Sequence, residues 1–121
     1  MIDPELVALL SAVETVEIST RGRSSGRLRR IEIWMYEIDG RYFITGTPGP
    51  RDWYANVLAE PILTLHLPGQ IDLEATAIPM NDSIVRRAVF TADKTWWYRS
   101  QTSVDDLVAN SPMVELTFAA H

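Results

Sequence analysis

The chain contains no cysteine, which excludes disulfide bonds, thiolate metal sites and cysteine nucleophiles together. Its two histidines, His66 and His121, are too few for a histidine-rich metal centre. No apolar run approaches the roughly 20 residues that cross a bilayer, and the first residues lack the basic-then-apolar layout of a signal peptide. We therefore expect a cytoplasmic protein without an integral membrane segment.

The 121 residues, 46% of them hydrophobic and 22% charged, predict one globular domain over residues 1–121. The net charge of -5 hides an asymmetry, because five of the eleven basic residues fall in residues 21–30, which contain no acid. Nucleic-acid binding usually requires a whole basic face. One basic segment on an acidic body instead favours a small anionic ligand over nucleic acid.

Hydrophobic periodicity and turn residues predict the elements in order. Asp39-Gly40 is a type I′ hairpin signal, and Asn81-Asp82 is a helix start with Ile84, Val85, Ala88 and Val89 facing inward. Helices are expected over 4–12, with Asp3 as its cap, and over 51–60, 82–91 and 104–110. Strands are expected over 15–20, 29–38, 41–45, 62–67, 71–79 and 113–119. About six strands in hairpins predict an α+β protein, mainly β: a small closed or split antiparallel barrel with peripheral helices.

Two segments have the composition of ligand sites. In Thr20–Gly26, glycines let the backbone approach a ligand while arginines and serines offer donors to an anion. The loop from Thr45 to Arg51 ends at a predicted helix start, whose free N–H groups favour anions or oxygen acceptors. A third segment, Trp96-Trp97-Tyr98-Arg99, is too bulky to point wholly into one small core. We expect part of it to face a pocket or an interface.

The first two of these segments, with the strand that leads to Tyr36 and the run Trp53-Tyr54-Ala55-Asn56-Val57-Leu58, resemble the deazaflavin-dependent nitroreductase and quinone reductase family. That family has a split β-barrel fold related to pyridoxamine-phosphate oxidases and uses coenzyme F420. The resemblance implies that the basic turn holds the phosphate and glutamyl tail of the coenzyme. It implies that the second loop and the helix after it hold the deazaflavin ring, and that Tyr98 hydrogen-bonds the substrate. The implied coenzyme contacts are Arg21, Arg23, Ser24, Ser25 and Gly26 for the tail, and Thr45, Gly46, Thr47, Pro48, Gly49, Arg51, Trp53 and Asn56 for the ring.

The resemblance implies hydride transfer from reduced F420 to a quinone, nitroaromatic or activated enone. Ser24 departs from the family, because many members have a lysine there. Flavin mononucleotide, haem or a fatty acid is an alternative ligand, since related split barrels bind these, and an arginine loop that docks an acidic partner or RNA is an alternative function. A homodimer and a membrane-peripheral location through the first helix also stay open.

No Ser/His/Asp grouping or metal-ligand spacing stands out, and His66 is expected on the outer face of its strand. Trp53 also has an ordinary interpretation as a core residue, and Asn56 as a surface residue. A chain with few acid–base candidates but an anion-binding turn and stacking aromatics suits chemistry that a cofactor supplies.

Overall fold

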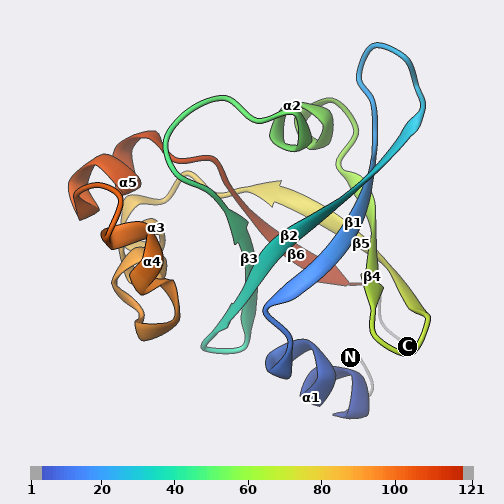
Figure 1. The fold of residues 1–121 in the computed structure, drawn as a ribbon, viewed down its shortest axis with the longest axis horizontal. Coiled ribbons are helices and arrows are strands. Elements are labelled where there is room, and N and C mark those ends of the chain that lie inside the picture. Colours follow the sequence, from blue (N-terminus) through green and yellow to red (C-terminus); the bar gives the residue numbers. More distant parts are fainter. Residues whose placement is uncertain (1–3, 119–121) are drawn as a thin grey trace.

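The computed structural model describes residues 4–118, which form six strands in a closed antiparallel barrel of order β1-β2-β3-β6-β5-β4 (Figure 1). Closure leaves none of these strands with a free edge, which suits a small sheet whose strands are joined mostly by hairpins. The fold predicted from the sequence is confirmed. The strands are β1 (Thr15–Arg21), β2 (Leu28–Ile38), β3 (Arg41–Thr45), β4 (Ile62–Leu67), β5 (Ile71–Pro79) and β6 (Met113–Phe118).

The helices gather around the barrel in three places (Figure 1). One helix lies at each end, α1 at the lower end in the figure and α2 at the upper end, while the three C-terminal helices stand together beside β3. The short 3-10 turn η1 (Asp93–Thr95) leads into α4. The helices are α1 (Pro4–Ala12), α2 (Asp52–Ala59), α3 (Ser83–Thr91), α4 (Trp96–Arg99) and α5 (Val104–Asn110). Asp3, the predicted cap of α1, and Ala119, the predicted end of β6, lie outside the described residues.

Local turn chemistry fixes the register of the hairpins. Asp39 and Gly40 have φ angles of 53° and 78°, the positive pair that a type I′ turn requires, and Ile38 pairs with Arg41 across it. In the second hairpin Leu67 pairs with Ile71 across a turn with positive φ angles at Gly69 and Gln70. Both hairpins agree with the sequence-based prediction. Because register decides which face each side chain occupies, these turns also determine which β2 residues reach the barrel interior.

Buried apolar side chains form two clusters. The first fills the barrel and includes Leu10 of α1, which is fully buried and covers the lower end. The second joins the outer face of β2 and β3 to the C-terminal helices, with Phe43, Phe90, Tyr98 and Leu107 among its members. This second cluster matters for the site, because it fixes α4 and its aromatic residues against β2.

The predicted inward face of α3 is partly wrong. Ile84 is 80% exposed and Ala88 is exposed, whereas Arg86 is buried beside Val89 and Phe90. The Arg86 guanidinium donates to the backbone oxygens of Met80, Val108 and Ser111 at 2.7, 2.6 and 2.5 Å. Burial lowers the pKa of Arg86. A prediction from the apolar face of one helix misses this arrangement, because two of the three carbonyls that let the cation be buried lie at the end of α5.

Candidate functional site

Two adjoining cavities open between β2, α2 and the loops that flank them. One has a volume of about 310 Å³ and the other about 510 Å³, and Ile31 and Trp53 line both. The two cavities are therefore halves of one cleft, with Trp53 on the wall between them. The aromatic cavity is lined by Ile31, Glu32, Ile33, Trp34, Thr45, Gly46, Thr47, Arg51, Trp53, Trp97 and Tyr98. The arginine cavity is lined by Thr20, Gly22, Arg23, Ser24, Ser25, Arg29, Ile31, Asp52, Trp53 and Asn56.

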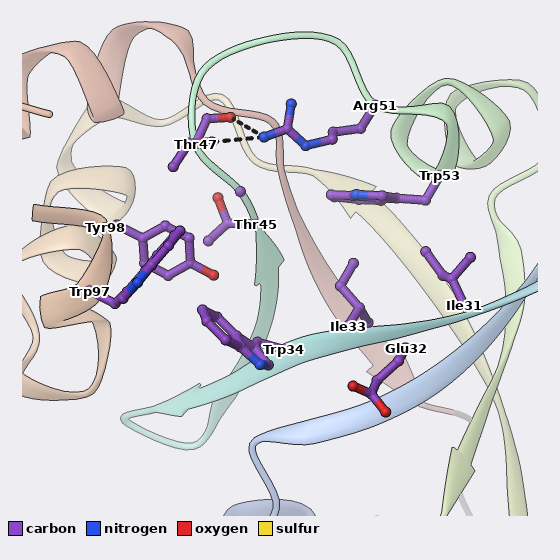
Figure 2. Close-up of a pocket in the computed structure, with 11 residues that line it drawn as sticks. Ile31, Glu32, Ile33, Trp34, Thr45, Thr47, Arg51, Trp53, Trp97 and Tyr98 are labelled. Carbon is purple, nitrogen blue, oxygen red and sulfur yellow. Dashed lines mark hydrogen bonds between the residues drawn. The ribbon is translucent and has the colours of Figure 1, made fainter. Parts of the chain in front are cut away.

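The floor of the aromatic cavity comes from strand alternation in β2. In Figure 2 the side chains of Ile31 and Ile33 project from this strand toward Trp53, whose ring covers them from α2. Only 7% of Trp53 is exposed, so its ring is held firmly in the barrel core while one side faces the cavity. The result is an apolar slot between a strand and a tryptophan ring, a shape that suits a flat ligand.

Three aromatic side chains form the far wall of this cavity. Trp34 of β2 packs edge-to-face on Trp97 of α4, with ring centroids 5.3 Å apart, and both also pack edge-on against Tyr98 (Figure 2). Trp34 is 39% exposed and Trp97 37%, whereas Tyr98 is 3% exposed. Tyr98 thus belongs to the protein interior, and the two tryptophans keep surface available for a ligand.

The Tyr98 hydroxyl is buried but has a polar partner. The hydroxyl of Tyr36 lies 3.3 Å away and donates to it. Burial is the largest cause that raises the pKa of Tyr98 far above its ordinary value, and burial also raises the pKa of Tyr36. Both phenols are therefore neutral at physiological pH, and the proton of Tyr98 remains available to an acceptor in the cavity.

The loop between β3 and α2 is held from within by Arg51. Its Nη2 atom donates to the backbone oxygen and the hydroxyl of Thr47 at 3.0 and 2.8 Å, and Nη1 donates to the Pro50 oxygen at 3.0 Å. A Cβ atom at Gly49, where φ is +129°, would lie 3.3 Å from Nη1 of the guanidinium. Arg51 is thus a loop-organising residue as well as a cationic edge of the cavity. The helix begins at Asp52, one residue after the predicted start, with Arg51 as its N-cap.

The basic turn between β1 and β2 is closed by its own backbone. Gly22 and Gly26 donate to the oxygens of Arg27 and Gly22 at 2.7 and 2.8 Å, and Ser25 Oγ accepts from the Arg27 amide at 3.2 Å. A Cβ atom at Gly22 would lie 2.8 Å from Ser25 Oγ and 3.3 Å from the Arg27 oxygen. Glycine at position 22 therefore fits this compact turn without displacing Ser25 or the Arg27 backbone.

The arginines of the turn do not share one role. Arg21 donates to the Gly26 oxygen at 2.6 Å, and Arg30 pairs with Glu17 at 3.0 Å on the outside of the barrel. Of the five arginines in residues 21–30, those that line the cleft within the described residues are Arg23 and Arg29.

Asn56 ties the turn to α2. It is 4% exposed, and its Oδ1 atom accepts from the Arg23 amide at 3.2 Å and from Arg23 Nη1 at 3.0 Å. Its Nδ2 atom donates to Thr20 Oγ1 at 3.3 Å. Both ends of the side chain are satisfied within the protein, so Asn56 holds Arg23 in place and is not the surface residue of the alternative interpretation.

The structure brings most of the predicted site residues to the cleft and leaves some away from it. Asn56 lines the arginine cavity and not the aromatic one, so it lies apart from Thr45, Gly46 and Thr47, with which it was grouped in the sequence. Arg21 and Gly26 stay within the turn, and Gly49 lines a separate cavity behind the loop with Pro50 and Tyr54. The predicted residues that line the cleft are Arg23, Ser24, Ser25 and Asn56 in the arginine cavity, Thr45, Gly46, Thr47, Arg51 and Tyr98 in the aromatic cavity, and Trp53 in both, whereas Pro48 lines neither.

Sequence reasoning assigned no site role to several residues that line the cleft, Arg29, Trp34 and Asp52 among them, and it did not single out Trp97 within the Trp96–Arg99 segment. The alternation of β2 carried a signal for Arg29, because it precedes Ile31 and Ile33 at spacings of two on one face. No local pattern pairs Trp34 with Trp97, since their contact depends on how α4 docks against the barrel.

A Ser–His–Asp series lies outside the cleft, and no local sequence pattern indicated it. His66 Nε2 is 2.7 Å from Ser19 Oγ, and Nδ1 is 2.8 Å from Asp72 Oδ1. Strand register explains the meeting, because His66 pairs with Glu17 of β1 on one side and with Asp72 of β5 on the other. Ser19 is 8% exposed and lies inside the paired strand β1, so the series is a cross-strand polar network and not an open nucleophilic site.

Solved structures with the same fold come from several kinds of protein. A conserved hypothetical protein from Mycobacterium tuberculosis has a TM-score of 0.72 at 15% identity, over 98% of this chain and 81% of that one. A protein from Clostridium acetobutylicum, of the pyridoxine-phosphate oxidase family, has a TM-score of 0.70 at 15% identity, over 97% and 86% of the chains. An F420H2-dependent reductase has a TM-score of 0.62 at 21% identity, over 86% and 94%. At these identities the likeness shows the split-barrel fold. No curated protein matches the sequence.

Among residues 4–118, no helix combines the length and the apolar composition needed to cross a membrane.

The family model of the F420H2-dependent quinone reductases matches residues 3–107. The cleft fits that cofactor, since a cationic cavity beside a flat apolar slot suits a ligand with an anionic tail and a planar ring. The match decides between the deazaflavin and the alternatives of flavin mononucleotide, haem or a fatty acid. The chain thus belongs to the F420H2-dependent quinone reductase family, and it is an oxidoreductase whose cofactor is coenzyme F420.

Proposed function

We propose that the aromatic cavity receives the deazaflavin ring together with the acceptor, and that the arginine cavity receives the phosphate and glutamyl tail. The observation that carries this assignment is the shared wall of Ile31 and Trp53, which makes the two cavities continuous. A ligand with a planar ring at one end and acidic groups at the other needs such adjoining apolar and cationic halves.

The bound coenzyme supplies the hydride. Ile31, Ile33 and Trp53 provide an apolar slot that excludes water and orients planar rings face to face. Arg51 keeps the Thr45–Thr47 edge of the slot in one conformation through its hydrogen bonds to Thr47. The protein thus contributes orientation and a dry environment, with little covalent work of its own.

Tyr98 is the residue that we assign to the acceptor. Hydride transfer to a quinone builds negative charge on the carbonyl oxygen, and a neutral buried hydroxyl that faces the cavity stabilises that charge by donating to it. Tyr36 supports this role, because its donation to Tyr98 leaves the Tyr98 proton for the acceptor. The raised pKa of Tyr98 keeps this proton in place across the physiological range.

Trp34 and Trp97 favour flat aromatic acceptors. Their half-exposed rings stand at right angles, with an interplanar angle of 88°, and meet beside Tyr98. An aromatic acceptor such as a naphthoquinone gains contact area and edge-to-face interactions there. Nitroaromatic compounds share this shape, whereas an activated enone offers less aromatic surface. We therefore place quinones first among the acceptors.

Fluorescence titration with oxidised F420, followed by assays of F420H2 oxidation with a naphthoquinone, tests the assignment. We expect saturable binding in the micromolar range and acceptor-dependent oxidation. Absence of binding at tens of micromolar coenzyme contradicts the placement of the coenzyme in the cleft. Tight coenzyme binding with no oxidation by any of the three acceptor classes contradicts the assignment of the acceptor to the same cavity.

A homodimer and a membrane-peripheral location are further proposals from the sequence. Static light scattering tests the first, and co-sedimentation with vesicles of zwitterionic lipid tests the second. A monomeric mass contradicts the homodimer, and a protein that stays in the supernatant contradicts the membrane-peripheral location.

A further inference from the structure

Arg29 is the arginine of the cleft with the fewest ties to the protein. It is exposed on β2, two residues before Ile31, so strand alternation directs it to the cleft side of the strand. Its Nε atom lies 3.9 Å from the position of a Cβ at Gly22, which places the guanidinium against the basic turn. Within residues 4–118, no carboxylate or carbonyl oxygen is hydrogen-bonded to its side chain.

Arg23, on the same wall, is already engaged. Its Nη1 atom is hydrogen-bonded to Asn56, and its Nη2 atom lies 3.6 Å from Oδ1 of Asp52. Asp52 stands at the start of α2 with 93% of its side chain exposed, and it lines the same cavity. The arginine cavity is therefore lined by two cations and one anion, and its net charge is one positive unit.

An anionic ligand meets these three groups differently. A phosphate pairs with a guanidinium through two parallel hydrogen bonds, and Arg29 has its donors free for this. Asp52 competes with the ligand for Arg23 and repels any negative charge placed beyond the first. A ligand with a single anionic group is matched by the net charge, whereas each added carboxylate near Asp52 is disfavoured.

We propose that Arg29 is the principal ligand of the coenzyme phosphate, and that Asp52 selects against coenzyme molecules with long glutamyl tails. The proposal rests on the proposed function, because it places the tail in the arginine cavity. It extends that function by naming the anion-binding residue and the residue that determines tail specificity.

The test measures dissociation constants by fluorescence for three ligands. These are short-tailed F420, long-tailed F420 and 8-hydroxy-5-deazariboflavin, the ring compound that lacks phosphate and glutamates. The variants are Arg29→Gln and Asp52→Asn. The matched control is Arg27→Gln, which removes the same charge from the same turn at a side chain that does not line the cleft. Thermal unfolding of each variant checks that the turn stays folded.

We expect Arg29→Gln to raise the dissociation constants of both F420 forms about tenfold or more, because one charge-assisted pair is lost. The dissociation constant of the ring compound should change by less than about twofold. Arg27→Gln is expected to change the dissociation constants of all three ligands by less than about threefold, since it removes only a screened long-range attraction. Asp52→Asn is expected to tighten binding, more for the long tail than for the short one.

Equal losses in Arg29→Gln and Arg27→Gln overturn the role of Arg29, since they show a general charge effect. Equal weakening of F420 and of the ring compound by Arg29→Gln overturns it as well. No preference for the short tail in the unaltered protein, or no gain in Asp52→Asn, overturns the role of Asp52. If the unaltered protein binds neither F420 nor the ring compound, the proposed function itself fails.

Discussion

The two halves of the cleft are built in opposite ways. The aromatic half is anchored by buried side chains: Trp53, Tyr98 and Thr45 are 7%, 3% and 4% exposed, and Thr45 also donates to the Pro112 oxygen. The arginine half is an exposed turn whose shape depends on a few backbone hydrogen bonds and on Asn56. The difference teaches that core packing holds the aromatic half rigidly, whereas the arginine half depends on local contacts and can adjust.

Tyr98→Phe is expected to have the largest effect. The substitution removes the donor to the developing negative charge and should lower kcat by about a hundredfold or more, with little change in F420 affinity. Stopped-flow oxidation of F420H2 by a naphthoquinone measures the rate, and fluorescence titration measures the affinity. A Tyr98→Phe variant that loses F420 affinity but keeps its kcat contradicts the assignment of catalysis and coenzyme binding to separate halves of the cleft.

The pH dependence of kcat tests the same role of Tyr98. Because the protonated phenol is the active form and its pKa is raised, kcat should show no loss from Tyr98 ionisation up to about pH 10, where a free tyrosine titrates. The measurement is kcat against pH in the unaltered protein, with Tyr98→Phe as the control for other groups. A descending limb near pH 8 that is absent in the variant contradicts the buried neutral phenol.

Arg23→Ala is expected to act on the other half. It removes a cation from the arginine cavity and one of the two donors to Asn56 Oδ1, so F420 should bind about tenfold more weakly. Turnover at saturating coenzyme should stay close to that of the unaltered protein. A fall in kcat with unchanged affinity shows that the tail site also positions the ring.

Asn56→Leu is expected to have a moderate effect on both stability and affinity. The change leaves Thr20 and Arg23 without a buried partner, which should cost about 1–3 kcal/mol in the free energy of unfolding and loosen the turn. Denaturant unfolding measures the first effect. Asn56→Asp keeps both acceptor bonds to Arg23, so coenzyme affinity should fall in the leucine variant more than in the aspartate variant.

Gly22→Ala is expected to have the smallest effect. The new Cβ would lie 2.8 Å from Ser25 Oγ, a side-chain atom that can rotate away, so the cost should be about 1 kcal/mol. Affinity for F420 should fall a few fold while 8-hydroxy-5-deazariboflavin binds as before. Equal weakening of both ligands shows that the turn reaches the ring site.

Local signals predicted most of the fold. Asp39-Gly40 and the Pro68–Gln70 turn defined two hairpins, and the hairpin-linked strands then pointed to a barrel. The inward face of α3 was mispredicted because two of the three partners of Arg86, the Val108 and Ser111 oxygens, lie more than 20 residues further along the chain. Ser19, His66 and Asp72 met through strand register, which no single segment encodes.

The candidate site was predicted as segments more securely than as residues. The basic turn and the Thr45–Thr47 loop do lie on one cleft, but which arginine faces it depends on hydrogen bonds that close the turn. The sequence alone does not distinguish Arg21 from Arg29, because the path of the backbone decides which of the two lines the cleft. Trp34 and Trp97 lie 63 residues apart in sequence, so their pairing required the packing of α4.

Three of the four tryptophans of the chain, at positions 34, 53 and 97, line the aromatic cavity. The ultraviolet emission of the protein therefore originates largely at this cavity, the proposed meeting place of ring and acceptor. Quenching of that emission reports occupancy without a label or a coupled assay. Purified protein can thus be screened for binding of colourless compounds. The screen depends only on the positions of the indole rings and does not require turnover.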